Sequence, residues 1–210
     1  MSATHAPRIN RTDAADRLLN ATSEILAERD TLEISVAEIS MRSGLNHGLV
    51  RYYFNGKEGL LLALLKRDAE IALENLRKLV ETPLPPMRKL ERHIRGVVRT
   101  YFRYPYINPL INYLQQSNEE NAGNLAEVFV QPLHRYQALI LDEALRAGDI
   151  RKVDSRFFYF ATIGACDQIF KSRRMLKDSF GIDELSSELI DEYGDFVFDL
   201  VTSGMRVGDR

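Results

Sequence analysis

Apolar residues recur at every third or fourth position through almost the whole chain, and this spacing restricts the fold more than any other feature. The first such stripe runs through Ala14, Leu18, Ala21 and Ile25. This spacing is typical of helices that bury one face, whereas a half-buried strand would alternate polar and apolar residues. The sequence therefore predicts an all-α protein of about nine helices, without strands.

Proline, glycine and capping residues mark where the predicted helices begin and end. Pro86 suits the first turn of a helix, Gly148 suits a left-handed C-cap, and Asp154 suits an N-cap. The terminal segments 1–10 and 204–210 are expected to form a flexible arm and a flexible tail. Asp154 is expected to cap one helix, which Gly181 and Asp183 separate from the last helix. Besides this helix and two short helices within 35–54, we expect helices over 12–29, 57–80, 86–104, 108–116, 122–147 and 184–201.

Composition excludes several classes of protein. The chain has 210 residues, 45% of them hydrophobic, which is enough for a buried core, and its formal net charge is −2. No uncharged stretch is long enough to span a membrane, and the N-terminal region contains no apolar signal segment. Cys166 is the single cysteine, so no internal disulfide can form. We expect a cytoplasmic protein without membrane contact, metal site or cofactor.

Residues 35–54 contain the most specific local signal. Ser35 and Glu38 have the spacing of a capping box, which starts a short helix. Gly44 stands where that helix must end in a sharp turn, because glycine adopts the left-handed backbone at little cost. Asn46 can cap a second short helix. Two short helices joined by a tight turn predict a helix-turn-helix, whose second helix can enter the major groove of DNA.

The outward face of the second helix contains residues that can contact DNA. His47, Arg51 and Tyr52 can donate to base edges or phosphates, and Gly48 permits close approach of the backbone. Lys57 begins the next helix, whose free N–H groups suit a phosphate. Arg8 and Arg11 could reach the DNA backbone from the other side. The predicted DNA-binding residues are Arg11, Ser35, Arg42, Asn46, His47, Gly48, Arg51, Tyr52, Tyr53 and Lys57.

The region from about residue 11 to residue 65 resembles the DNA-binding domain of TetR-type (tetracycline-repressor-like) transcriptional regulators. The resemblance rests on Val36-x-x-Ile39, Ser43-Gly44-Leu45-Asn46, Tyr52-Tyr53-Phe54 and Lys57-Glu58-x-Leu60. It implies a DNA-binding domain over 11–56, with a recognition helix at about 46–53. It also implies a helical regulatory and dimerisation domain over 57–203.

The sequence departs from the family pattern at two places. Asp30 replaces the usual glycine, and Arg51 replaces the usual phosphate-binding tyrosine, with Tyr52 at the next position. Residues 1–60 hold seven Lys or Arg and eight Asp or Glu, a net charge of −1. We therefore expect an asymmetric domain. Arg8, Arg11, Arg42, Arg51 and Lys57 should face DNA, and most acids should lie on the far side of the first helix.

The part of the chain after Pro83 is rich in aromatic residues, which build either an ordinary core or the wall of a ligand pocket. The proline-interrupted segment 104–109 is our candidate for the pocket. The expected effector is an apolar or aromatic small molecule, although 103–105 and 148–154 faintly resemble a subgroup that senses pyrimidines. The predicted ligand-binding residues are Arg99, Phe102, Arg103, Tyr106, Asn112, Tyr113, Gln116, Phe129, Tyr136, Cys166 and Gln168.

Two further patterns concern charge and association. Five arginines recur every three or four residues and form either a solvated face beside acids or, at Arg99 and Arg103, a site for an anionic head group; they are Arg88, Arg92, Arg95, Arg99 and Arg103. The family resemblance implies that the last two helices form a dimer interface. The predicted contacts there are Phe157, Phe160, Gly164, Gln168, Phe196 and Leu200.

These observations predict a homodimeric regulator, expected to be a repressor that a small molecule releases from a palindromic operator. An activator, or a repressor that needs a co-repressor, remains an alternative. A helical protein-binding module without DNA binding is an alternative from another class. An enzyme has little support, because the sequence has no phosphate-binding glycine loop and because His93 and His134 are expected to be surface or satisfied core residues.

Overall fold

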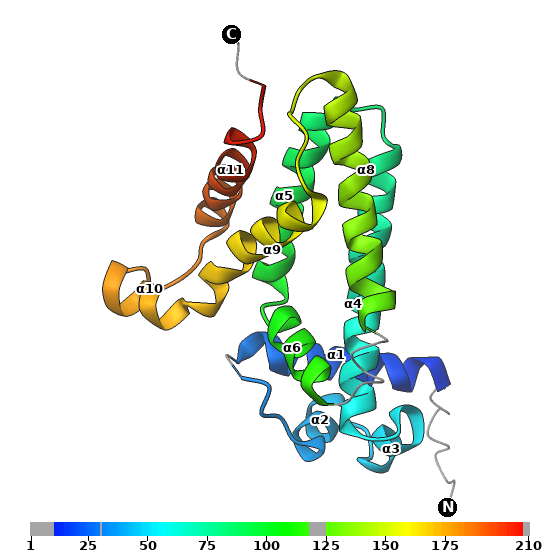
Figure 1. Ribbon diagram of the computed structural model, residues 1–210. Coiled ribbons are helices and arrows are strands. Elements are labelled where there is room, and N and C mark those ends of the chain that lie inside the picture. Colours follow the sequence, from blue (N-terminus) through cyan, green and yellow to red (C-terminus); the bar gives the residue numbers. More distant parts are fainter. Residues whose placement is uncertain (1–10, 30, 118–124, 208–210) are drawn as a thin grey trace, which may run out of the picture.

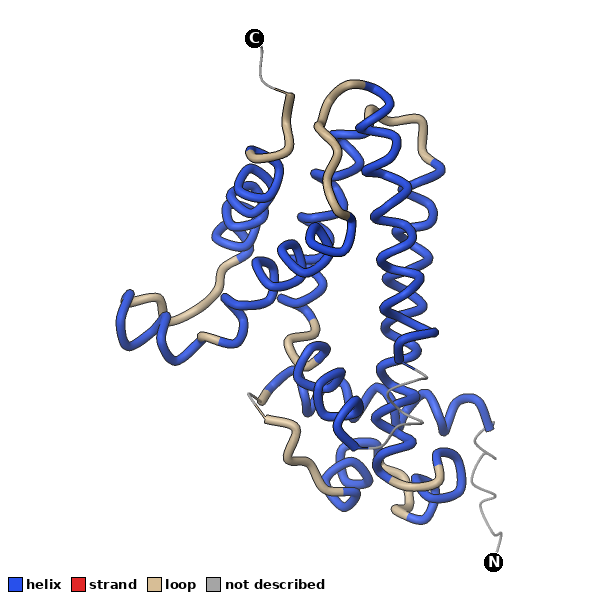
Figure 2. Tube along the Cα trace, viewed as in Figure 1, coloured by secondary structure: helices blue, strands red, loops and turns tan. Residues whose placement is uncertain are grey.

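The described part of the chain is entirely helical. The computed structural model describes residues 11–29, 31–117 and 125–207, which form ten α-helices and one π-helical turn. Within these ranges Figure 2 shows only helices and loops, and one isolated antiparallel bridge joins Ile150 to Arg206. The all-α prediction is confirmed, with one helix more than expected.

Three helices, two of them short, surround the start of a long one at one end of the molecule (Figure 1). They are α1 (Arg11–Glu28), α2 (Val36–Ser43) and α3 (Gly48–Phe54), and they surround α4 (Lys57–Glu81). Apolar side chains from all four are buried together: Leu18, Leu26, Ile39, Val50, Leu60 and Leu61 are each at most 1% exposed. Burial of this kind supplies most of the stability of short helices, which are marginal when isolated.

The long helix α4 continues from this end into the larger half of the molecule (Figure 1). Its 25 residues span about 37 Å. There it packs against α5 (Pro86–Arg103), α6 (Ile107–Ser117) and α8 (Gln131–Ala147). Two further helices, α9 (Ser155–Lys171) and α11 (Ser187–Ser203), pack on α5. The predicted domain boundary after residue 56 falls at the start of α4.

Most predicted helix ends are found with the expected chemistry. The Oδ1 atom of Asp154 accepts from the backbone N–H of Arg156, and α5 begins at Pro86. Gly148 ends α8 with φ of 79°. The last helix begins later than expected, at Ser187, because the Oγ atom of Ser186 caps it by accepting from the Leu189 N–H.

Two predictions about helix continuity were wrong. The helix after Asp154 ends at Lys171, and a separate helix α10 (Arg173–Phe180) follows Ser172. The predicted helix 122–147 is not a uniform α-helix, because residues Ala126–Val130 form a π-helical turn. Pro132 follows this turn and has no N–H to donate to the preceding turn, which favours such a widening. Residues 118–124 lie outside the described part of the chain.

Candidate DNA-binding surface and effector cavity

The helix-turn-helix forms as its caps predicted. The Oγ atom of Ser35 accepts from the Glu38 N–H at 3.2 Å, and the Glu38 carboxylate accepts from the Ser35 N–H at 2.8 Å. The Ser35 N–H and the guanidinium of Arg29 lower the pKa of Glu38 to about 2. Gly44 ends α2 with φ of 68°. Arg17 of α1 donates to the Ser43 carbonyl at 2.7 Å, which ties this turn to the first helix.

The recognition helix α3 is joined to α4 by an unusually close turn. Asn55 and Gly56 adopt φ of 58° and 116°. A Cβ on Gly59 would lie 1.8 Å from the carbonyl oxygen of Phe54, so only glycine fits there. The orientation of α3 is therefore set directly by the first turn of α4.

The outward face of α3 is open to solvent. The helix α3 begins at Gly48, two residues later than predicted. Asn46 still acts as its cap, because its Oδ1 atom accepts from the Gly48 N–H at 2.8 Å. His47, Gly48 and Arg51 are exposed. The side chain of Tyr52 is also exposed, and its ring packs edge-to-face on that of half-buried Tyr53 at 4.9 Å.

The basic residues expected to face DNA differ in whether an acid pairs with them. Among the described residues, neither Arg51 nor Lys57 has an acidic partner within ion-pair distance. Arg42, however, donates to both carboxylate oxygens of Glu28 at 2.8 Å and lies 3.4 Å from Glu24, so α1 holds its guanidinium. The side chain of Arg11, and Arg8 entirely, lie outside the described part of the chain.

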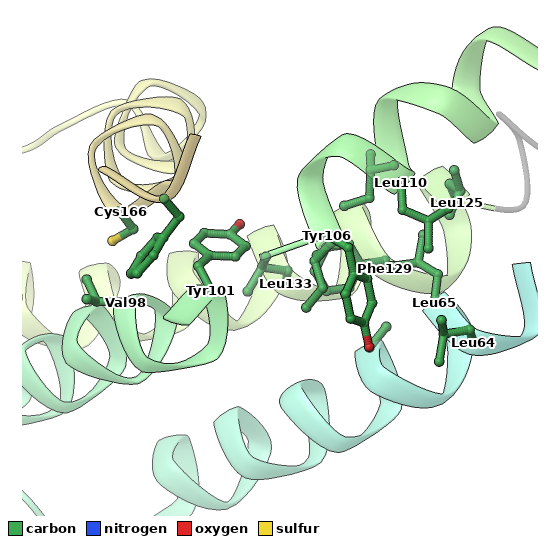
Figure 3. Packing of buried hydrophobic residues seen from close by; sticks show 14 of the residues in the cluster. Leu64, Leu65, Val98, Tyr101, Tyr106, Leu110, Leu125, Phe129, Leu133 and Cys166 are labelled. Carbon is green, nitrogen blue, oxygen red and sulfur yellow. The ribbon is translucent and has the colours of Figure 1, made fainter. Parts of the chain in front are cut away.

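A cavity of about 240 Å³ lies between α4, α5 and the segment formed by the π-turn and α8. Its wall is mostly apolar, which is typical of small-molecule sites. In Figure 3, Leu65, Tyr101, Phe129 and Leu133 are among the labelled core residues, and all four line this cavity. Its polar lining residues are Asp68, Asn75, Arg92, His93, Thr100 and Tyr101.

Two polar groups in the cavity wall are buried and hydrogen-bonded. The Gln137 amide donates to Nε2 of His93 at 2.8 Å, and burial lowers the pKa of His93 to about 4, so the ring is neutral at pH 7. This confirms the expectation of a satisfied core histidine. Asp68, 5% exposed, accepts from Arg67 Nε at 3.0 Å and from the hydroxyl of Tyr106 at 2.7 Å.

The Asp68 carboxylate belongs to a polar network that joins the two halves of the molecule. The Tyr106 hydroxyl lies 2.7 Å from Ser23 Oγ of α1, and Arg67 donates to Asn20 of α1 at 2.8 Å. Burial and the neighbouring Asp68 raise the pKa of Tyr106, so its hydroxyl remains a donor. We call Asn20, Ser23, Arg67, Asp68 and Tyr106 the interdomain network.

Of the predicted ligand-binding residues, Phe129 lies in the cavity wall and the other ten do not. Arg99 pairs with Asp191 of α11 at 2.9 Å, and Arg103 lies over the ring of Tyr104. Tyr106 belongs to the interdomain network. Four others are exposed, three are half-buried or buried in the core, and none of these seven lines the cavity: Asn112, Tyr113, Gln116, Gln168, Phe102, Tyr136 and Cys166.

Of the proline-interrupted segment 104–109, which was the predicted pocket, Ile107 alone lines the cavity. Most of the cavity wall comes from α4 and α5, which are unbroken helices, and from the π-turn and α8. Asp68 was the residue that could have indicated a buried polar site in this region, because a carboxylate in an otherwise apolar stripe of α4 must find buried partners. Cys166 is a buried filler; burial raises the pKa of its thiol to about 12.

The predicted dimer residues form an exposed apolar face. Phe157 and Phe160 of α9 are 73% and 72% exposed, and Phe196 and Leu200 of α11 are 61% and 57% exposed. Gly164 is also exposed on α9, and no atom lies within 4 Å of the position of a Cβ there. We call these five residues the α9/α11 face. Large apolar side chains gathered at a surface mark an interaction site.

The fold and its surfaces define a helical DNA-binding protein of the helix-turn-helix class. Residues 18–64 match the family described as bacterial regulatory proteins, tetR family. Residues 83–209 match the tetracyclin repressor-like C-terminal domain. The chain therefore belongs to the TetR family of transcriptional regulators. The family is not enzymatic, and the match over residues 18–64 covers the helix-turn-helix.

Curated relatives are similar over parts of the chain. The transcriptional repressor Rv3405c of Mycobacterium tuberculosis is 28% identical over 126 residues, covering 54% of this chain and 65% of that protein. The match thus spans just under two thirds of this relative. The regulator BetI of Stenotrophomonas maltophilia is 25% identical over 76% of this chain and 87% of its own length.

Solved structures share the fold. The transcriptional regulator FadR from Bacillus subtilis, in complex with stearoyl-CoA, superimposes with a TM-score of 0.71 at 21% identity, covering 90% of this chain and 98% of that one. FadR from Bacillus halodurans gives a TM-score of 0.69 at 20% identity, with coverage of 91% and 99%. At these identities the likeness concerns the fold. None of the described helices has an apolar stretch long enough to cross a lipid bilayer.

Proposed function

We propose that the protein is a homodimeric repressor that binds a palindromic operator and is released by a small molecule held in the cavity between α4 and α5. The observation that carries this proposal is the continuity of α4. Its first turn fixes the recognition helix at Gly59, and residues 65–79 of the same helix supply eight residues to the cavity wall.

The exposed face of α3 supports the contact with DNA. Arg51 and Tyr52 project outward with His47, and Lys57 stands at the N-terminus of α4, where backbone N–H groups favour an anion. Arg51 and Tyr52 can both hold phosphates, while His47 is placed to read base edges. We assign Arg42 an indirect role, because its pairing with Glu28 and Glu24 joins α2 to α1.

The α9/α11 face supports the homodimer. Two copies that bury this face against each other by twofold symmetry would present two recognition helices, as a palindromic operator requires. Ion pairs from Arg95 to Asp195 and from Arg99 to Asp191 hold α11 on α5, which borders the cavity. A ligand between α4 and α5 can therefore influence both the position of α3 and the dimer partner.

The interdomain network supplies a route from the cavity to α1. Asp68 lines the cavity, and its partners Tyr106 and Arg67 each reach a residue of α1. An effector that displaces Asp68 would weaken these contacts and favour a second arrangement of the two halves. Release of the operator then follows from the higher affinity of the effector for that arrangement.

Selection of fragmented genomic DNA by the purified protein at about physiological salt, followed by sequencing, tests the proposal. We expect enrichment of one palindromic site, and adding metabolite extract should release it. If the extract strengthens binding, the effector is a co-repressor. If the bound sites activate a reporter, the protein is an activator. No enrichment with or without extract would contradict DNA regulation and favour the protein-binding alternative.

A further inference from the structure

The five regularly spaced arginines of α5 differ in their partners. Arg95 and Arg99 form ion pairs with Asp195 and Asp191 of α11. Two others interact with residues close to them in sequence. Arg88 pairs with Glu91, and the guanidinium of Arg103 lies 5.3 Å from the ring centre of Tyr104. Among the described residues, Arg92 is the member of this row with no acidic or aromatic partner.

Arg92 is also the member of the row that lines the cavity. It is exposed, as are Asn75 of α4 and Gly96 of α5, which line the cavity with it, so these three residues form the opening. Gly96 leaves the opening wide, because no atom lies within 4 Å of the position of a Cβ. The opening is therefore cationic, and the interior beyond it is largely apolar.

The carboxylate of Asp68, at the other end of the cavity, determines which way an anionic ligand would be oriented. Asp68 lies two turns, about 10 Å, before Asn75 along α4. Both oxygens of its carboxylate already accept hydrogen bonds, from Arg67 and from Tyr106. An anionic group placed there would meet a like charge, whereas at the opening it would meet the guanidinium of Arg92.

We propose that the effector is an amphipathic anion, whose apolar tail fills the cavity and whose anionic group is bound by Arg92 at the opening. The inference rests on the proposed function in taking this cavity as the effector site. The volume of about 240 Å³ is slightly below the roughly 300–1,000 Å³ usual for ligand sites, which favours a short or medium-length tail. The anionic group can be a free carboxylate or the phosphates of an acyl carrier.

Calorimetric titration of the full-length protein tests this without DNA, so its failure is distinct from a failure of DNA binding. The probes are octanoate, 1-octanol and octanoyl-CoA, which share a tail and differ in charge. We expect Arg92→Gln to weaken the binding of each anionic probe that the cavity accepts about tenfold to hundredfold. The affinity for 1-octanol should be unchanged. Arg88→Gln removes the same charge from the same helix, outside the cavity, and should leave all affinities unchanged.

A second variant locates the tail. Gly96→Leu narrows the opening without changing its charge and should weaken binding of all three probes. Arg92-dependent binding of octanoate supports a free acid, and Arg92-dependent binding of octanoyl-CoA alone supports a phosphorylated carrier. The proposal is overturned if no probe binds, if 1-octanol binds as tightly as the anions, or if Arg92→Gln weakens every probe equally.

Discussion

The outward face of α3 and the α9/α11 face both expose large aromatic side chains, yet their chemistry differs. Tyr52 is 67% exposed beside a histidine and an arginine, whereas Phe160 is 72% exposed beside further phenylalanines. The first face offers hydroxyl, imidazole and guanidinium donors, which suit phosphates and base edges. The second offers only hydrocarbon, whose burial against another apolar surface is favourable. Exposure alone therefore marks both surfaces, and the polar groups distinguish their partners.

The two faces are also held differently. The orientation of α3 depends on backbone geometry within five residues, from Phe54 to Gly59. The position of α11 depends instead on residues distant in sequence: its Ile190 and Val197 are buried, and Arg95 and Arg99 of α5 reach Asp195 and Asp191. We infer that α3 is oriented by local backbone geometry, whereas α11 is placed by tertiary packing on α5.

The largest effect is expected from Gly59→Ala. The added Cβ would overlap the Phe54 carbonyl, so the variant must displace α3 or unwind the first turn of α4. Urea denaturation should show a loss of about 3 kcal/mol in the free energy of unfolding, with loss of operator binding. The control Gly96→Ala adds a methyl group in open space and should gain about 0.5–1 kcal/mol. Full stability of Gly59→Ala would contradict the close α3–α4 turn.

Phe160→Glu tests whether the α9/α11 face, and not the face of α3, holds two copies together. The side chain is exposed in the single chain, so the fold should be unaffected, but a charge in a dimer core should raise the dimer dissociation constant about a hundredfold or more. Sedimentation should then detect monomers with weaker operator binding. Ile71→Glu alters another exposed apolar residue, on α4, and should remain dimeric. A dimeric Phe160→Glu protein would place the interface elsewhere.

Tyr106→Phe tests the connection between the halves. Removing the hydroxyl leaves Asp68 with one hydrogen bond fewer, which should cost about 1–3 kcal/mol of unfolding free energy. In a fluorescence assay of operator release, the variant should also need less effector. Tyr113→Phe removes an exposed hydroxyl from the adjoining helix α6 and should change neither quantity. Unchanged release in Tyr106→Phe would remove the interdomain network from the mechanism.

The smallest expected effect belongs to Lys57→Gln. Loss of one phosphate contact should weaken binding to all sequences alike and reduce the slope of log affinity against log salt by about 0.9. Gel-shift titrations over several salt concentrations measure this slope. Lys78→Gln, near the far end of the same helix, should leave the slope unchanged.

By contrast, His47→Gln should change the preference among operators in a binding-site selection, and an unchanged preference would refute its role in base reading.

Local sequence signals predicted the helix-turn-helix well because its determinants lie close together in the chain. The Ser35–Glu38 capping box, the left-handed Gly44 and the Asn46 cap each act over two or three residues. Prediction was poorer in the larger half. There the helices were largely found, but the residues of the cavity were not, because a cavity is made by helices that are distant in sequence.

By itself, the sequence determined that the chain is helical, where most helices begin and end, and that it contains a helix-turn-helix, since periodicity and caps are short-range properties. Only the tertiary structure decided which of the five equivalent arginines has no acidic or aromatic partner within the described ranges. Arg88, Arg92, Arg95, Arg99 and Arg103 share one helical row in the sequence, but α11 supplies acids to Arg95 and Arg99, and α4 leaves a cavity beside Arg92. Charge pairing and cavities depend on what packs against a helix, and a helix's own residues do not specify its neighbours.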